Sequence, residues 1–237
     1  MTNKKQMILS NSALRENSLI KNVYLWMSLG LAITGVVAFA VSQNMTLLKL
    51  FNTNPFMLFA ILIAQFAIVM VLSGRLQQLR SSTAMGLFIA YSVVNGISLS
   101  SLFIIYTGVV LTQAFLTTAA MFLGATLFAS VTKKNIASWG GYLTMGLWGL
   151  LVAMLINMFF PNSSTFTLMV SIIGVVLFMG LTVYDTARIK SINSTYGREM
   201  NNEEFVKIGI IGALNLYLDF LNIFLYVLRI LGIKNRD

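Results

Sequence analysis

Seven long apolar runs constrain this chain more than any other feature of its sequence. Each run approaches or exceeds the roughly 20 residues that a helix needs to cross a bilayer. In lipid, only helices and closed barrels satisfy all their backbone hydrogen bonds, and continuous runs of this length indicate helices. We therefore predict an all-α polytopic membrane protein with seven transmembrane helices. The runs cover residues 23–41, 55–73, 83–106, 109–132, 138–160, 165–187 and 208–231.

Composition supports this class and excludes several chemistries. Of 237 residues, 57% are hydrophobic and only 10% are charged, whereas about a quarter are charged in soluble domains. The chain has no Cys and no His, which excludes thiol chemistry and removes both the commonest metal ligand and the usual pH switch. No phosphate-binding loop or zinc-protease motif is present. We expect no enzyme activity and no cofactor.

The basic residues indicate an orientation rather than a nucleic-acid patch. With the amino terminus in the cytoplasm, twelve of the 16 Lys and Arg residues fall on the cytoplasmic side, as the positive-inside rule requires. We predict a polar basic arm over residues 1–22, one transmembrane domain over 23–232 and a short basic tail over 233–237. Seven full spans place the tail outside, and a re-entrant last segment would place it inside.

The last apolar run contains a carboxylate near its middle, Asp219. A charge at the bilayer centre costs roughly 2.5–3.5 kcal/mol on insertion scales, and such residues usually face a cavity, a partner or an ion path. Asn215, Asp219 and Asn222 are spaced i, i+4 and i+7 and share one helix face. This pattern predicts a central helix with one polar stripe. The alternative is a neutral, hydrogen-bonded packing residue.

Asp185 is the only other acidic residue inside an apolar run. Two carboxylates on adjacent antiparallel helices would titrate as a unit, and in a chain without His they would form its natural pH-sensitive element. The alternative is an ion pair with Arg188 at the membrane edge. Counted from the ends of the apolar runs, Asp185 lies about 5 Å deep and Asp219 about 16 Å deep. Contact therefore requires one of the two helices to extend.

Two further groups of polar residues are candidates. Asn95 and Ser98 continue a stripe on the third run that either lines a path or bonds to a neighbouring helix. Arg80 begins that run and either reaches a carboxylate or anchors the helix at the interface. An intramembrane aspartyl protease is disfavoured, because Leu218-Asp219 lacks the glycine context of that family's second motif.

Several stretches resemble the Bax inhibitor (transmembrane Bax inhibitor motif) family, and in particular its bacterial inner-membrane members. Residues 181–190 (LTVYDTARIK) and 212–232 (GALNLYLDFLNIFLYVLRILG) resemble its last two helices. The resemblance extends to residues 100–107 (SSLFIIYT) and to the VTKKN stretch. It therefore covers the whole membrane region.

This resemblance implies a fold with the last helix central and wrapped by the other six. It implies a pH-sensitive calcium leak in which Asp185 and Asp219 form a hydrogen-bonded pair that gates the pore and meets Ca²⁺ only weakly and transiently. Aligning Ala84-Met85-Gly86 makes Arg80 the partner of the pair. The chain departs from its relatives in a longer link between the two aspartates and in lacking a Glu in the second helix. Both departures bear on the gating and the ion coordination and not on the fold.

We therefore expect a pH-sensitive calcium or cation leak channel in a cell inner membrane, with the lipid bilayer and Ca²⁺ as partners and no nucleic acid. Two alternatives stay open. One is a regulatory protein that modulates a membrane-bound protease or a stress response through the arm and the link between the last two helices. The other is a proton-coupled transporter of a small solute. The candidate pore-lining residues are Asn215, Asn222, Asn95 and Ser98.

Overall fold

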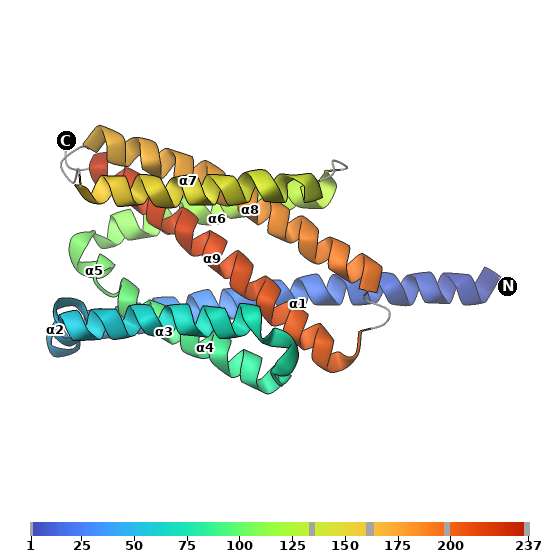
Figure 1. Cartoon of the computed structure of the whole chain (residues 1–237). Coiled ribbons are helices and arrows are strands. Elements are labelled where there is room, and N and C mark those ends of the chain that lie inside the picture. The colour runs from blue at the N-terminus through green and yellow to red at the C-terminus, as the bar shows by residue number, and fades with distance from the viewer. Residues whose placement is uncertain (1, 133–135, 160–163, 197–199, 235–237) are drawn as a thin grey trace. The chain divides into compact units, whose positions relative to one another are not determined.

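The computed structural model describes residues 2–132, 136–159, 164–196 and 200–234. The described residues are almost all helical and contain no strand. Seven helical segments are long and apolar enough to cross a membrane, which confirms the predicted fold class. The elements, shown in Figure 1, are α1 (Thr2–Ser42), α2 (Met45–Thr53), α3 (Pro55–Gly74), η1 (Leu76–Gln78), α4 (Ser81–Leu99), α5 (Leu102–Ile105), α6 (Gly108–Val131), η2 (Ile136–Trp139), α7 (Gly140–Phe159), α8 (Ser164–Tyr196) and α9 (Asn202–Lys234).

The first of two compact units contains Met1–Ile105 and Ile189–Tyr217. In this unit α4 packs against both α1 and α3. The approach of α1 and α4 depends on Gly96, where an added Cβ would lie 2.7 Å from the Cβ of Val37 and 2.8 Å from the carbonyl oxygen of Thr34. Small residues at such crossings let two membrane helices come together.

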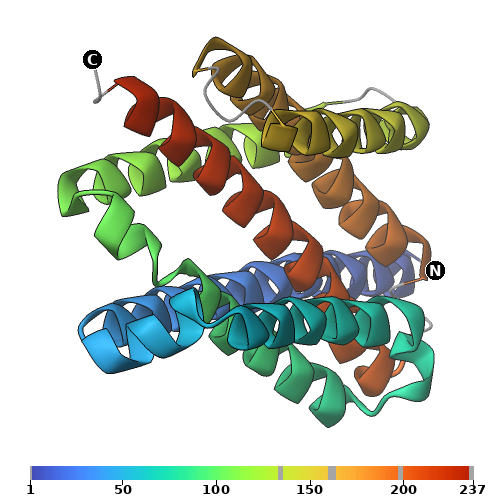
Figure 2. The ribbon, with the colours of Figure 1, turned by 60° about the vertical axis from the view of Figure 1, so that its left-hand side comes forward.

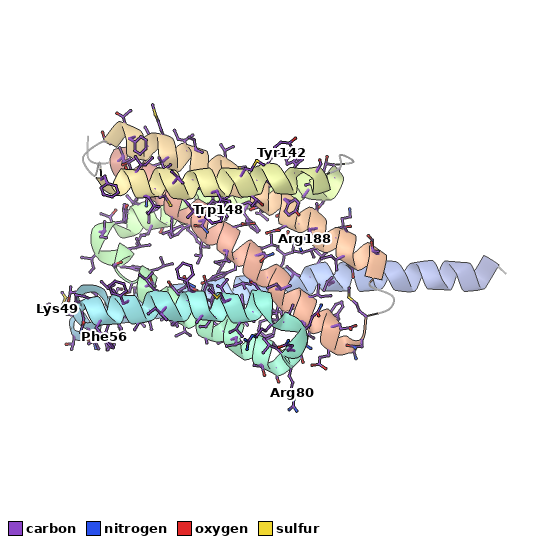
Figure 3. All side chains as sticks on the ribbon, in the orientation of Figure 1. Lys49, Phe56, Arg80, Tyr142, Trp148 and Arg188 are labelled. Atoms are coloured by element: carbon purple, nitrogen blue, oxygen red, sulfur yellow. The ribbon has the colours of Figure 1, made fainter. Side chains whose placement is uncertain are left out.

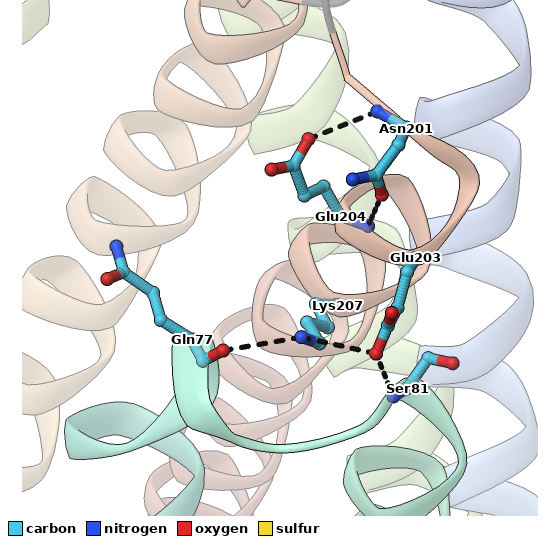
Figure 4. Close-up of polar contacts among 6 residues, drawn as sticks. All are labelled: Gln77, Ser81, Asn201, Glu203, Glu204 and Lys207. Atoms are coloured by element: carbon cyan, nitrogen blue, oxygen red, sulfur yellow. Dashed lines mark hydrogen bonds and ion pairs between the residues drawn. The ribbon is translucent and has the colours of Figure 1, made fainter.

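A capping box begins α9, in the first unit. The side-chain oxygen of Asn201 accepts a hydrogen bond from the backbone N–H of Glu204 at 2.8 Å, and the Glu204 carboxylate accepts one from the N–H of Asn201 at 3.1 Å. This reciprocal pair satisfies two donors that a helix start would otherwise leave free. Figure 4 shows both contacts. The local sequence therefore fixes the point at which α9 starts.

The first turn of α9 also holds the start of α4. The Glu203 carboxylate accepts a hydrogen bond from the N–H of Ser81 at 3.3 Å and pairs with Lys207 at 3.3 Å (Figure 4). Lys207 in turn donates to the carbonyl oxygen of Gln77 at 3.4 Å. Arg80, at the N-cap of α4, makes no side-chain cap bond. A carboxylate at a helix N-terminus is favourable, so Glu203 takes over this role from a distant part of the chain.

The second unit contains Tyr106–Arg188 and Leu218–Asp237. Here α7 lies beside α8, as Figures 1 and 2 show. An added Cβ at Gly146 of α7 would lie 2.8 Å from a methyl group of Leu177 on α8. In the same unit, α6 packs against α9 through aromatic rings. The Phe220 ring of α9 lies edge-on to two rings of α6, with centroid distances of 5.7 Å to Phe115 and 5.6 Å to Phe122.

The last helix is central, because it enters the core of both units. Its most apolar window is 61% buried, against 44% for α8 and 6% for α3 and α7. In the first unit it buries Leu214 and Tyr217 completely, and in the second it buries Ile223 completely and Tyr226 almost so. A helix that is apolar on most sides belongs in a core. The poorly buried α3 and α7 present the broad apolar faces expected of helices that contact lipid.

Two long helices extend further than the sequence predicts. The apolar pattern ends the sixth helix near residue 187 and begins the seventh near 208, whereas α8 continues to Tyr196 and α9 begins at Asn202. Apolar composition marks the part of a helix that lipid can surround, but the backbone hydrogen bonds continue into polar sequence until a cap ends them. The extension of α8 and α9 supplies the additional helix length that an approach of Asp185 to Asp219 requires.

Two local features were not predicted at all. The helix α2 follows the first span, and its N-cap residue Asn44 accepts hydrogen bonds from the N–H groups of Thr46 and Leu47 at 3.0 and 3.2 Å. The third span is interrupted, because α4 ends at Leu99 and α5 starts at Leu102. The predicted boundaries of the arm, the transmembrane domain and the tail stay predictions.

The crossing of α1 and α4 generates a stability prediction. We expect Gly96→Ala to cost about 1–3 kcal/mol, because its methyl group would meet backbone and a Cβ that cannot move easily. Gly86→Ala on the same helix is the matched control, since nothing lies within 4 Å of an added Cβ there. The control should leave stability equal or slightly raised. Thermal unfolding in detergent measures both, and equal unfolding temperatures would contradict the prediction.

Candidate functional site

The site forms where α8 and α9 run antiparallel to each other. In the second unit, an added Cβ at Gly174 would lie 2.6 Å from the Tyr226 ring, and Thr182 forms a side-chain hydrogen bond with Asp219. The earlier of these two residues on α8, Gly174, meets the later residue on α9, Tyr226, as expected for two antiparallel helices. Small residues along this seam let the helices approach, and polar side chains then meet across it.

Asp219 is the most deeply buried carboxyl group of the described residues. The residue is only 4% exposed. Thr182 hydrogen-bonds to the carboxyl group, and Thr182 also donates to the carbonyl oxygen of Phe178 at 2.9 Å. The second carboxyl oxygen, Oδ2, has no hydrogen-bond partner in the described part of the protein. A buried polar atom in this state is costly, so its presence calls for an explanation other than packing.

The structure places the two predicted aspartates on α8 and α9, within electrostatic reach of each other. Asp185 is half-buried on α8 and lies within electrostatic reach of Asp219 and of Arg188. Arg188 is exposed, one turn further along α8; Figure 3 shows its position. Sequence analysis left open whether Asp185 belongs to a coupled pair or to an ion pair at the membrane edge. In the structure, Asp185 has both Asp219 and Arg188 within electrostatic reach.

No other titratable side chain of the second unit competes with this pair from α6 or α7. The segment Gly108–Val131 contains none. In α7 the only one is Tyr142, which is 77% exposed and points outward in Figure 3. On α9, Arg229 lies over the ring of Tyr226, 5.7 Å from its centroid. On α8, Tyr184 lies against Gly140 of α7.

The predicted pore-lining residues have different environments. Asn222 is half-buried and donates to the carbonyl oxygen of Leu218 in its own helix at 2.8 Å. Asn95 is buried in the first unit, where it accepts a hydrogen bond from Gln65 at 3.2 Å and so joins α3 to α4. Asn215 and Ser98 are half-buried. Asn95 therefore has the interhelical bond of a packing residue, and the pore-lining role of all four stays a prediction.

Arg80 belongs to the first unit and is exposed at the start of α4. Figure 3 shows its side chain pointing away from the helix. Its predicted role as the partner of the aspartates stays a prediction.

Sequence reasoning missed a buried polar contact of α9 in the first unit. The hydroxyl groups of Tyr217 and Thr34 lie 2.7 Å apart. Thr34 donates to the carbonyl oxygens of Gly30 and Ser92, both at 2.9 Å, so Tyr217 is the donor to Thr34. The Tyr217 ring also lies edge-on to Phe88, with the centroids 5.8 Å apart. No signal in the sequence pairs Thr34 with Tyr217, because 183 residues separate them.

The described residues contain no group of three or more His, Cys, Asp or Glu side chains placed to hold a metal ion. A tightly bound divalent cation requires six to eight oxygen ligands. Asp185, Asp219 and Thr182 offer only a few.

These features define a polytopic helical membrane protein with two carboxyl groups at the seam of its last two helices. The family model described as "Inhibitor of apoptosis-promoting Bax1" matches residues 16–236. The chain therefore belongs to the Bax inhibitor family, as its last two helices predicted.

Relatives match over most of their length. The inner membrane protein YbhL of Escherichia coli K12 is 40% identical over 211 residues, which cover 89% of this chain and 89% of that protein. An uncharacterised protein of Borreliella burgdorferi is 39% identical over 237 residues, which cover 100% of this chain and 99% of the relative. One from Deinococcus radiodurans is 37% identical over 207 residues, or 87% of each chain.

The unpaired oxygen of Asp219 leads to a test of stability. We expect Asp219→Leu, which has the same branched shape without polar atoms, to leave the unfolding temperature unchanged or raise it. Thr182 keeps its bond to Phe178, so no new polar group is orphaned. Tyr217→Phe is the contrasting control on the same helix. It removes the hydrogen bond to Thr34 and should lower the free energy of unfolding by about 0.6 kcal/mol. A clear fall in unfolding temperature for Asp219→Leu would show that the carboxyl group stabilises the fold.

Proposed function

We propose that this protein is a pH-sensitive cation leak channel, with Ca²⁺ as its ion, and that Asp185 and Asp219 form its gate. The observation that carries the proposal is the placement of two carboxyl groups within electrostatic reach of each other on α8 and α9, with one oxygen of Asp219 buried and unpaired. Buried ionisable residues in membrane helices commonly mark ion paths and proton relays. The sparse set of oxygen ligands favours passage of the ion over tight binding.

Proton occupancy of the pair supplies the pH sensitivity. Two negative charges close together in a poorly solvated site repel each other, and a proton held by the pair removes this repulsion. The contact between α8 and α9 at this point therefore differs between the two protonation states. Such a change in contact free energy is what a two-state gate requires.

We infer the location from a relative and from charge. The name of the E. coli relative describes an inner membrane protein, and we propose the same membrane for this chain. We also propose a cytoplasmic amino terminus, because this orientation puts twelve of the 16 Lys and Arg residues on the cytoplasmic side.

Ca²⁺ entry into liposomes carrying the purified protein tests the function between pH 5 and 8. We expect a pH-dependent flux in the parent that loses its pH dependence in Asp219→Asn, because that side chain cannot exchange a proton. Asp185→Asn should have the same effect if the two carboxyl groups act as a unit. Protein-free liposomes are the blank. No flux above the blank at any pH would contradict the channel and favour a regulatory role through a protein partner.

The orientation has its own test, for which the absence of native Cys is useful. Gln43→Cys follows the first span and Gln78→Cys follows the second, and both side chains are exposed. We expect a membrane-impermeant maleimide to label Gln43→Cys in spheroplasts and Gln78→Cys only after permeabilisation. The reverse pattern would place the amino terminus outside.

A further inference from the structure

Two buried oxygen atoms in the second unit lack a partner in the described structure. One is Oδ2 of Asp219 on α9, and the other is the hydroxyl oxygen of Thr118 on α6. Thr118 is 0% exposed and Asp219 is 4% exposed. Buried polar atoms in native proteins are nearly always hydrogen-bonded, so two exceptions in one compact unit call for a common explanation.

Thr118 lies on the face of α6 that carries the two rings in contact with Phe220 of α9. It follows Phe115 by three positions and precedes Phe122 by four, so all three side chains share one side of the helix. The Phe115 and Phe122 rings both lie edge-on to Phe220, with centroid distances of 5.7 and 5.6 Å. Phe220 is the residue next to Asp219. Thr118 therefore lies on α6 between the two residues whose rings contact α9 at this level.

Helix geometry alone does not account for the free hydroxyl. Other threonines in this protein bond to the carbonyl group four residues earlier, as Thr112 does with Gly108 at 2.8 Å and Thr182 with Phe178 at 2.9 Å. Ala114, one turn before Thr118, is completely buried, so this face accepts an apolar side chain. A valine at 118 would have the same shape without an unpaired hydroxyl, whose burial costs about 1–3 kcal/mol.

We propose that Thr118 is a further residue of the cation path, whose hydroxyl oxygen, with Oδ2 of Asp219, contacts the hydrated cation as it passes α9. This inference rests on the proposed leak function and adds a residue from a third helix to it. Oxygen is the ligand type that hard cations such as Ca²⁺ prefer. Thr118 is neutral, and α6 has no titratable side chain. It therefore contributes to the rate of passage rather than to the response to pH.

Three variants in the same liposome assay test this role. Thr118→Val removes the hydroxyl at constant shape, Thr118→Ser restores it, and Thr112→Val removes an exposed hydroxyl from the same helix as a control. We expect Thr118→Val to reduce Ca²⁺ flux at least fivefold with its pH profile unchanged. Thr118→Ser should keep most of the flux, and Thr112→Val should match the parent. Thermal unfolding should show Thr118→Val to be as stable as the parent or more stable.

The outcomes separate this inference from the proposed function. Equal flux in Thr118→Val and the parent would overturn the role of Thr118 and leave the channel standing. A parallel loss of flux and of thermal stability would overturn it too, because the hydroxyl group would then be structural. Absence of flux in the parent would overturn the proposed function first and this inference with it.

Discussion

Polar groups inside a membrane protein are tolerated only where neighbouring helices shield them from lipid, and this constraint governs the structure. The last helix carries Asn215, Asp219 and Asn222 on one face, and its span is the most buried of the seven. Exposure of that face to hydrocarbon would cost several kcal/mol. In the first unit α1 and α4 contact α9 through Thr34 and Phe88, and in the second α6 and α8 contact it through Phe115 and Thr182. The least buried spans, α3 and α7, keep broad apolar surfaces for lipid.

The seam between α8 and α9 shows how this shielding also creates a site. Gly174 allows close approach at one point of the seam, and the adjoining turns then bring Thr182 and Asp185 to Asp219. Antiparallel packing sets which side chains meet, since each helix advances by about 1.5 Å per residue. A carboxyl group that would be costly beside lipid is held instead beside a hydroxyl group and a second carboxyl group.

One continuous helix carries both kinds of polar contact. Tyr217 bonds to Thr34 in the first unit, and two residues later Asp219 bonds to Thr182 in the second. A rotation or shift of α9 would alter both contacts together.

The sequence by itself determined the seven spans, the all-α class and the family, and it singled out Asp185 and Asp219 as candidates. Apolar runs and buried charges are local signals, because the bilayer sets their length and their cost. Only the tertiary structure decided that α8 and α9 extend beyond their apolar runs, that Glu203 caps α4, and that Thr182 bonds to Asp219. These features depend on which helix faces meet across long stretches of chain, and hydrophobic periodicity carries no information about that choice.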